Sequence, residues 1–143
     1  MWFGENFGFA LKALAASIEP ERPAIVQGER VLTWAELDTK TDAIAAALHA
    51  KGLKPGDVAG QMLRNTPDYL LAYFGCVKAG VTPVNVNYHY KARELEDIFA
   101  RFCLRALFTE SDFAEPGIAA MPSGTLSVNV GSPDWEAMQA HEL

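Results

Sequence analysis

The segment from Thr66 to Asn87 shows the clearest order of apolar and polar positions, and it predicts a helix followed by a short buried strand. Thr66 is placed to cap the helix, and Pro67 suits the first helical position because its missing N–H would have no partner there. Gly80 stands where a sharply turning helix needs a left-handed residue. Pro83 cannot donate to a ladder, so we expect it at the start of the strand. The predicted apolar stripe of the helix has three- and four-residue spacing: Tyr69, Leu70, Tyr73, Cys76 and Val77.

The residues before this segment predict a first helix and a β-hairpin. Asn6 is placed to cap the helix, and the prolines that follow should end it. A helix docked on a core is favoured over a membrane-surface helix, because the polar face holds a single cation. Two short runs, residues 24–27 and 30–33, then flank a Gly-Glu pair at the spacing of a tight hairpin. Four residues are expected on the core face of the first helix: Phe7, Leu11, Leu14 and Ile18.

A longer helix should follow the hairpin. Thr33 and Glu36 have the spacing of a capping box, in which each side chain accepts a hydrogen bond from the other residue's N–H. The helix is expected to end at Lys51-Gly52. Its many alanines indicate close packing rather than chemistry. Its predicted core stripe is Leu37, Thr41, Ile44, Ala45 and Leu48.

Strands and helices alternate in the rest of the chain. Residues 58–63 predict a buried strand, which leads into the helix and strand described first. A polar, aromatic loop at 87–90 precedes a further helix from about Ala92, and residues 106–109 predict the next strand. The core face expected for the helix from Ala92 consists of Leu95, Ile98, Phe99 and Phe102.

Beyond Ser111, prolines and glycines weaken the pattern, although residues 126–130 predict one more strand and 133–141 a short helix. We therefore divide the chain into a front part, residues 1–113, and a weaker continuation of the same incomplete domain, residues 114–143. The order of helix, hairpin and then alternating strands and helices indicates an α/β fold. It should have a mainly parallel sheet flanked by helices, with a small β-hairpin near the start.

Composition narrows the class of protein. Half of the 143 residues are hydrophobic, and the net charge of −6 favours neither nucleic acid nor an anionic membrane as a partner. No apolar run reaches transmembrane length, and Glu5 stands where a signal peptide would carry basic residues. Cys76 and Cys103 both fall in predicted helices, which favours buried, reduced thiols. We expect a cytoplasmic protein.

Local motifs reveal no active site. The chain has no GxGxxG, no GxxxxGK[ST] and no GxSxG motif. Its histidines, His49, His89 and His141, have no His, Cys or acid at metal-ligand spacing. Cys76 lies on an apolar stripe, where a thiol is far more often part of the core than a nucleophile.

Six sequence blocks, in order and in spacing, nevertheless resemble one superfamily. They are residues 22–26 (RPAIV), 32–37 (LTWAEL), 52–58 (GLKPGDV), 64–69 (RNTPDY), 78–85 (KAGVTPVN) and 94–95 (EL). The chain resembles the N-terminal portion of adenylate-forming enzymes, which include acyl-CoA synthetases, luciferases and peptide-synthetase adenylation domains. Residues 83–88 (PVNVNY) are most similar to fatty-acyl-CoA ligases. The similarity runs from about Leu11 to Phe113.

The resemblance implies a two-step reaction. A carboxylic acid, such as a fatty acid, attacks the α-phosphorus of ATP, and the thiol of coenzyme A then displaces AMP from the acyl-adenylate. In the family this chemistry uses a Ser/Thr/Gly-rich phosphate loop, a Mg²⁺-associated acid, a ribose-binding Asp and a lysine on a C-terminal lid. None of these motifs occurs in this sequence. We therefore expect the complete enzyme to need ATP, Mg²⁺, coenzyme A and the remainder of the ligase fold, and this chain alone to bind none of the cofactors tightly and to be inactive.

One family contact has a counterpart here. Some coenzyme A ligases carry an arginine in the loop after the corresponding strand, where it meets a phosphate of coenzyme A. His89 occupies that position, and imidazole lacks the two-pronged geometry of guanidinium. Lys91 or Arg93 could supply the charge instead. The alternative, a solvated basic start of a helix, is the simpler interpretation of these cations.

Two other functions remain open at this point. The chain could be a non-catalytic module that keeps this fold for partner binding or assembly, or an independent Rossmann-like nucleotide binder, which the absent glycine loop disfavours. In every case strands 58–63 and 84–86 need apolar cover on both faces. We therefore expect an exposed apolar patch or sheet edge, and a tendency to self-associate.

Overall fold

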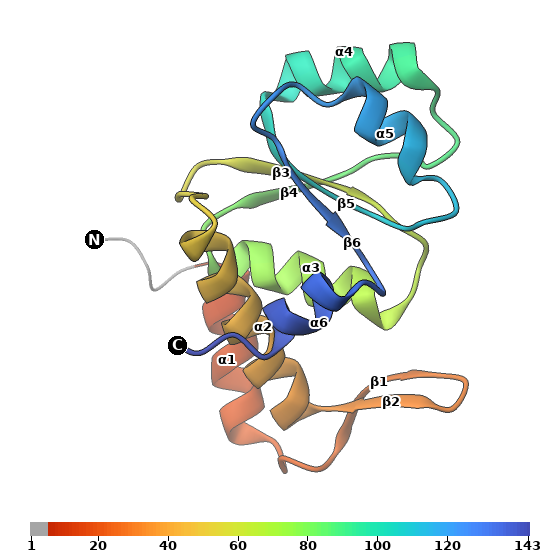
Figure 1. Ribbon diagram of the computed structural model, residues 1–143. Coiled ribbons are helices and arrows are strands. Elements are labelled where there is room, and N and C mark those ends of the chain that lie inside the picture. The colour runs from red at the N-terminus through yellow and green to blue at the C-terminus, as the bar shows by residue number, and fades with distance from the viewer. Residues whose placement is uncertain (1–5) are drawn as a thin grey trace.

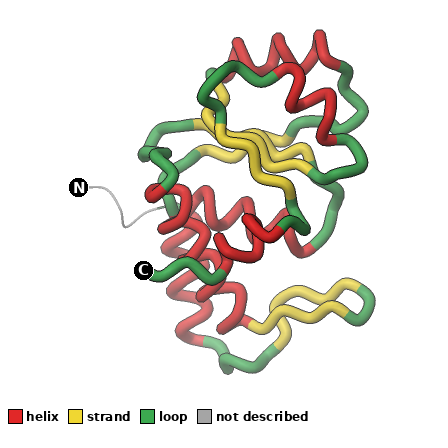
Figure 2. Tube along the Cα trace, in the orientation of Figure 1, coloured by secondary structure: helices red, strands yellow, loops and turns green. Residues whose placement is uncertain are grey.

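A computed structural model describes residues 6–143, so Glu5 lies outside the described residues. A four-stranded parallel sheet forms the middle layer, with helices on both faces and a separate two-stranded hairpin (Figures 1 and 2). The α/β fold expected from the sequence is confirmed. The elements in chain order are α1 (Phe7–Ser17), β1 (Pro23–Gln27), β2 (Arg30–Thr33), α2 (Trp34–Ala50), β3 (Val58–Met62), α3 (Pro67–Lys78), β4 (Thr82–Asn85), α4 (Ala92–Phe102), β5 (Leu104–Thr109), α5 (Ala114–Ala120), β6 (Leu126–Asn129) and α6 (Pro133–Gln139).

The strands of the sheet lie in the order β4-β3-β5-β6, and all their pairings are parallel. Gly60 of β3 stands opposite Val84 on one side and Leu107 on the other. Within residues 6–143, β4 and β6 are the two edges. Pro83 is the second residue of β4 and not its first, which corrects the predicted start. An edge strand tolerates the proline because one side of its ladder has no partner strand.

The larger core lies between the sheet and the layer of α2, α3 and α6, with α1 behind them (Figure 1). Ile44 and Leu48 of α2 and Leu71 of α3 are fully buried there. Trp135 of α6 is also fully buried. Its ring meets Phe108 edge-on at 5.9 Å between centroids, and its indole N–H donates to Asp68 Oδ1 at 2.9 Å. The predicted stripe of α2 is confirmed, and so is its capping box, in which the Glu36 N–H donates to Thr33 Oγ1 at 3.1 Å.

The predicted apolar stripe of α3 is wrong by part of a turn. The helix buries Leu71, Ala72, Gly75 and Cys76, whereas Leu70 is exposed. The small residues decide this, because a Cβ at position 75 would collide with the side chain of Ile44. The predicted cap is also absent: Thr66 has the extended backbone of a capping residue, but its side chain accepts no hydrogen bond from the helix.

The first helix is also buried less than its sequence predicts. Asn6 caps it as expected, accepting from the Gly8 N–H at 2.8 Å, but only Gly8 and Leu11 are buried. Phe7 is 72% exposed and Leu14 is 47% exposed. The helix approaches α3 through Gly8, since a Cβ there would stand 2.7 Å from Lys78 Cγ.

Four charged residues connect α1, α2 and α3. The Lys78 ammonium, which is almost buried, donates to Asp38 at 2.6 Å and to Asp42 at 2.7 Å. Lys12 of α1 pairs with the same two carboxylates. The two cations and two anions balance, so the cluster holds three helices together without leaving a buried charge unpaired.

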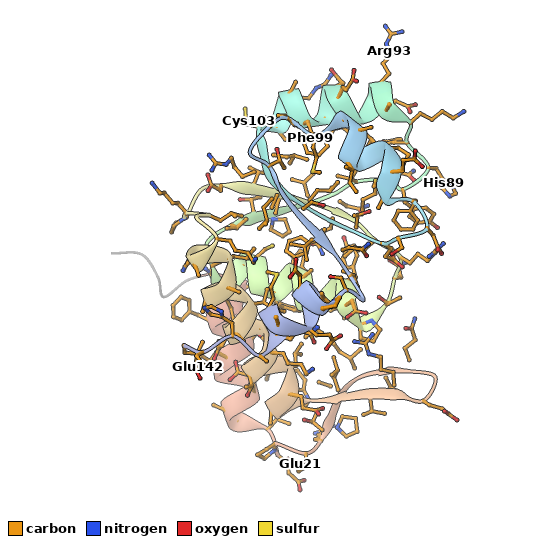
Figure 3. The ribbon with its side chains drawn as sticks, viewed as in Figure 1. Glu21, His89, Arg93, Phe99, Cys103 and Glu142 are labelled. Carbon is orange, nitrogen blue, oxygen red and sulfur yellow. The ribbon has the colours of Figure 1, made fainter. Side chains whose placement is uncertain are left out.

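A smaller core lies on the other face of the sheet, under α4 and α5. Figure 3 shows Phe99 pointing from α4 toward the strands, and Leu95 is buried beside it as predicted. Phe102 is 44% exposed, which corrects its predicted place in the core. Cys103 is also exposed and caps α4 with a left-handed backbone, φ 51°, so the prediction of a buried helical thiol is wrong for this cysteine.

The helix α5 was not predicted. Pro116 and Gly117 suggested an irregular segment, yet residues 114–120 are helical. Pro116 lies in the first turn, where backbone N–H groups have no partner within the helix. Gly117 brings the helix close to the sheet, because a Cβ there would stand 2.8 Å from Met62 Cε.

Candidate functional site

The carboxyl ends of β3, β4, β5 and β6 open on one edge of the sheet, where ligands bind in open parallel α/β folds. Three loops at this edge carry polar and aromatic side chains: residues 63–66 after β3, 86–91 after β4 and 110–113 after β5. We therefore take this edge as the candidate functional site. The sequence predicts only the loop after β4 as part of a site, through His89 and Lys91, because the edge is assembled from three loops that are distant in the chain.

Arg64 lies at the centre of this edge. Its guanidinium donates to Glu110 Oε1 at 3.3 Å and to Asp112 Oδ2 at 3.0 Å. Its backbone N–H also donates to Glu110, at 2.6 Å. The loop after β3 is thus bound to the loop after β5 through one residue.

The same guanidinium contacts two stacked aromatic rings. Its central carbon lies 5.0 Å from the Phe113 centroid and 5.9 Å from the Tyr88 centroid, within the range of cation–π attraction. The two rings are 4.8 Å apart and nearly parallel, at 21°. His89 follows, its ring 4.5 Å from that of Tyr88. Arg64, Tyr88, Phe113 and His89 therefore form one contiguous cluster, called here the edge cluster.

Among the residues that the structure describes, three buried polar atoms near the strand ends have no hydrogen-bond partner: Gln61 Oε1, Thr109 Oγ1 and Asn129 Oδ1. Thr109 and Asn129 are direct neighbours in the β5–β6 register. The Asn129 amide N–H donates to Ser111 Oγ at 2.9 Å. Each unpaired oxygen can accept a hydrogen bond from an incoming donor.

The structure places two of the three predicted site residues in the loop after β4 and the third on α4. His89, Lys91 and Arg93 are all exposed. His89 lies in the loop after β4, and its N–H donates to Asn87 Oδ1 at 2.9 Å. Lys91 precedes α4, where its N–H donates to the Glu94 carboxylate at 2.6 Å. Figure 3 shows Arg93 on the outer side of α4, pointing away from the domain and from His89.

The acids and histidines of the described residues are the candidates for a Mg²⁺ site. Within residues 6–143, no group of three or more His, Cys, Asp or Glu residues is placed to hold a metal ion. The nearest acids to the edge cluster, Glu110 and Asp112, are both engaged by Arg64.

Two further properties bear on function. Burial raises the pKa of the Cys76 thiol to about 12, so it stays protonated and unreactive in the folded core. In the part of the chain that the structure describes, no helix has the length and apolar character needed to span a bilayer.

The fold defines the class of protein. The chain superimposes on a benzoate CoA ligase from Burkholderia xenovorans LB400 with a TM-score of 0.84 at 20% identity, covering 95% of this chain and 28% of that one. It matches the N-terminal domain of FACL13 from Mycobacterium tuberculosis with a TM-score of 0.82 at 22% identity, covering 96% of this chain and 37% of that one. At these identities the likeness shows a shared fold, that of the N-terminal domain of adenylate-forming enzymes.

Sequence comparison gives the family. Residues 13–142 match the AMP-binding enzyme family. A fatty acid–[acyl-carrier-protein] ligase, ScoC, from Streptomyces coeruleorubidus is 36% identical over 125 residues, which are 85% of this chain and 24% of that protein. A medium/long-chain-fatty-acid–CoA/3-oxocholest-4-en-26-oate–CoA ligase from Mycobacterium marinum is 33% identical over 103 residues, 72% of this chain and 19% of that protein.

The chain belongs to the AMP-binding enzyme family, and it corresponds to the N-terminal portion of the longer enzymes that it matches, as its six sequence blocks indicated. It spans a quarter or less of the length of these two curated relatives.

Proposed function

We propose that this chain supplies the front part of the AMP-binding domain of a cytoplasmic, ATP-dependent acyl-CoA ligase that activates a fatty acid. The family match over residues 13–142 carries this proposal. The substrate class is supported by relatives whose own activities are fatty-acid ligations. The cytoplasmic location, a reducing compartment, is supported by the free thiols of buried Cys76 and exposed Cys103.

In this proposal the chain alone is inactive and binds ATP, Mg²⁺ and coenzyme A only weakly. Stabilising a transferring phosphoryl centre takes positioned donors and cations. The sequence lacks the family's phosphate loop and lid lysine, and the acids near the sheet edge are paired with Arg64. Residues 1–113 form the front of the domain, and residues 114–143 are the weaker continuation of the same incomplete domain.

We assign the coenzyme A phosphate contact to His89, with Lys91 and Arg93 as neighbouring cations. His89 and Lys91 lie on the exposed loop after β4, at the carboxyl edge. Arg93 points outward and would act at longer range, by raising the local potential. The test is a longer chain that includes the downstream coding sequence. There His89→Ala should raise the KM for coenzyme A and leave adenylate formation unchanged, while His89→Arg should lower that KM. An unchanged KM in both variants would refute the contact.

Pyrophosphate exchange on the chain as given tests the predicted inactivity. Purified protein is assayed with short, medium and long fatty acids, and size-exclusion chromatography is run on the same sample. We expect no acid-dependent exchange. Substrate-dependent exchange by a monodisperse monomer would show that the active site lies within these residues. Sequencing the DNA after the codon for Leu143 tests whether a phosphate loop follows.

A non-catalytic partner-binding module is the second candidate, and one surface favours it. An apolar groove of about 340 Å³ lies between α1, the hairpin and α3, lined by Phe7, Leu14, Ile25, Trp34 and Leu70 among others. Phe7, Leu14 and Leu70 are exposed apolar side chains. If the downstream DNA lacks a phosphate loop and the chain self-associates, the second candidate replaces the first.

A further inference from the structure

We infer that Arg64 is a positioning residue for the loop that carries His89. The functional part of this inference rests on the proposed coenzyme A contact. The structural part rests on the edge cluster alone, in which one side chain joins all three loops at the carboxyl edge.

The first step is how Arg64 is itself held. Two carboxylates from the loop after β5 accept from its guanidinium, and Glu110 also accepts from its backbone N–H. Three contacts to one neighbouring loop fix both the backbone and the head group of a residue that is otherwise 45% exposed in its side chain. A guanidinium held in this way keeps its central carbon over the aromatic rings of Tyr88 and Phe113.

The second step is what Arg64 holds. The loop after β4 carries Tyr88, a residue that is 37% exposed. The Tyr88 ring is stacked on Phe113, and both rings lie within reach of the Arg64 cation. Cation and stacked rings attract each other electrostatically, and this attraction favours one ring orientation over the alternatives available to an exposed loop.

The third step links this arrangement to His89. The imidazole follows Tyr88 directly in the chain, and its centroid lies 4.5 Å from that of the tyrosine ring. A loop fixed at Tyr88 therefore fixes the approach of His89. Arg64 also balances part of the negative charge of Glu110 and Asp112, which would otherwise repel a phosphate at this edge.

Nuclear magnetic resonance of the full chain tests the inference without an activity assay. In the wild type the Tyr88 and Phe113 ring protons should show ring-current shifts from their stacking. Arg64→Gln should remove more than half of these shifts and move the His89 ring signals. Arg64→Lys keeps the charge without the planar face, so it should restore only part of them.

Arg30→Gln is the matched control. The Arg30 side chain is exposed to a similar degree, 44%, and forms a two-pronged pair with Asp68. Arg30 is not a member of the edge cluster. The inference is overturned if Arg64→Gln leaves the ring signals of 88, 89 and 113 in place, or if Arg30→Gln moves them equally. If Arg64→Gln does not fold, Asp112→Asn is used with the same two readings, since it removes one anchor of the guanidinium.

A titration of the longer chain, the one used to test His89, with coenzyme A separates the two proposals. Ligand-dependent shifts at His89 in the wild type that are weaker in Arg64→Gln support both. If coenzyme A moves no signal at His89 while Arg64→Gln still moves the rings, the coenzyme A contact fails and the positioning role of Arg64 stands.

Discussion

Helices α2 and α4 cover opposite faces of the same sheet, yet they are buried in different ways. Seven of the 17 residues of α2 are buried, and the helix packs against α1, α3 and α6. Only Leu95 and Phe99 are buried among the 11 residues of α4. Helix α2 lies inside a layer of helices, whereas α4 lies on the surface above a thin core (Figure 1).

This difference explains which parts of the sequence are easy to interpret. A helix covering one face shows one apolar stripe and a charged opposite side, as α4 does. A helix with neighbours on several sides must use small residues to let them approach. The alanines of α2 and Gly75 of α3 do this, and they weaken the stripe by which the core face would be recognised.

The largest expected effect is the loss of a core leucine from the thicker layer. Leu71→Ala should lower the free energy of unfolding by an amount near the upper end of the range of about 2–5 kcal/mol. For Leu95→Ala we expect a loss near the lower end of that range, because the surface helix α4 can move onto the sheet and fill the space. Both leucines are fully or almost fully buried, so exposure does not distinguish them. Urea denaturation of the two variants measures the difference, and equal losses would show that the two layers pack alike.

The next largest difference in stability between the two layers is expected when a glycine in each is replaced by alanine. Gly75→Ala places a Cβ against the Cβ and Cγ2 of Ile44, so we expect a loss of about 1–3 kcal/mol. Gly117→Ala meets the ends of two side chains, Met62 Cε and Leu107 Cδ2, each at 2.8 Å. Side-chain ends can shift more easily than the branched Cβ of Ile44, so the loss should be smaller, and the substitution gains the helix propensity of alanine. Thermal unfolding checks this order. If the collision is the cause, the double variant Gly75→Ala, Ile44→Ala should lose less stability than the sum of the two single losses, because Ile44→Ala removes the atoms that the new Cβ meets.

The charged cluster between α1, α2 and α3 should make the stability of the fold depend on pH in the acidic range. Burial acts to raise the pKa of Asp42, but hydrogen bonds and charge from Lys12 and Lys78 outweigh it, so the pKa lies below its ordinary value of 3.8. A carboxyl group with a lowered folded-state pKa adds stability above its unfolded pKa, and that stability is lost as the pH falls through the folded-state value.

Asp42→Asn should therefore cost on the order of 1–2 kcal/mol at neutral pH, between the ranges for exposed and buried pairs because Asp42 is partly exposed. The difference in unfolding free energy between this variant and the wild type should shrink as the pH falls below 3.8. Asp97→Asn removes the exposed pair with Arg101 on α4 and should have almost no effect. A pH-independent difference for Asp42→Asn would rule out the ionic origin.

The smallest expected effect concerns two threonines at helix starts. Thr33→Ala should cost about 1 kcal/mol, because it leaves the Glu36 N–H without its acceptor, and Thr33→Ser should restore most of it. Thr66→Ala should change stability little, because Thr66 makes no capping hydrogen bond. The melting temperatures of the three variants measure these losses. Equal losses at positions 33 and 66 would contradict the different capping of the two helices.

Most of the helices and strands could be predicted because their signals are local. Asn6, the Thr33–Glu36 pair and Gly80 act within a few residues of their own position, and the structure confirms each of them, with Gly80 at φ 76°. The family could also be predicted, because it depends on several blocks in register. The candidate site could be predicted only in part. The resemblance indicates His89, but Arg64, Tyr88 and Phe113 belong to three loops that meet only in the folded sheet.

The sequence by itself determined the α/β class, the hairpin and the order of elements, because periodicity, caps and turns are properties of neighbouring residues. Only the tertiary structure decided which face of α3 is buried, where Trp135 lies and what surrounds Arg64. Those features depend on the shape of partners far along the chain. The fit of Gly75 against Ile44, or of one guanidinium against two rings, is set by packing in three dimensions, which a one-dimensional pattern does not contain.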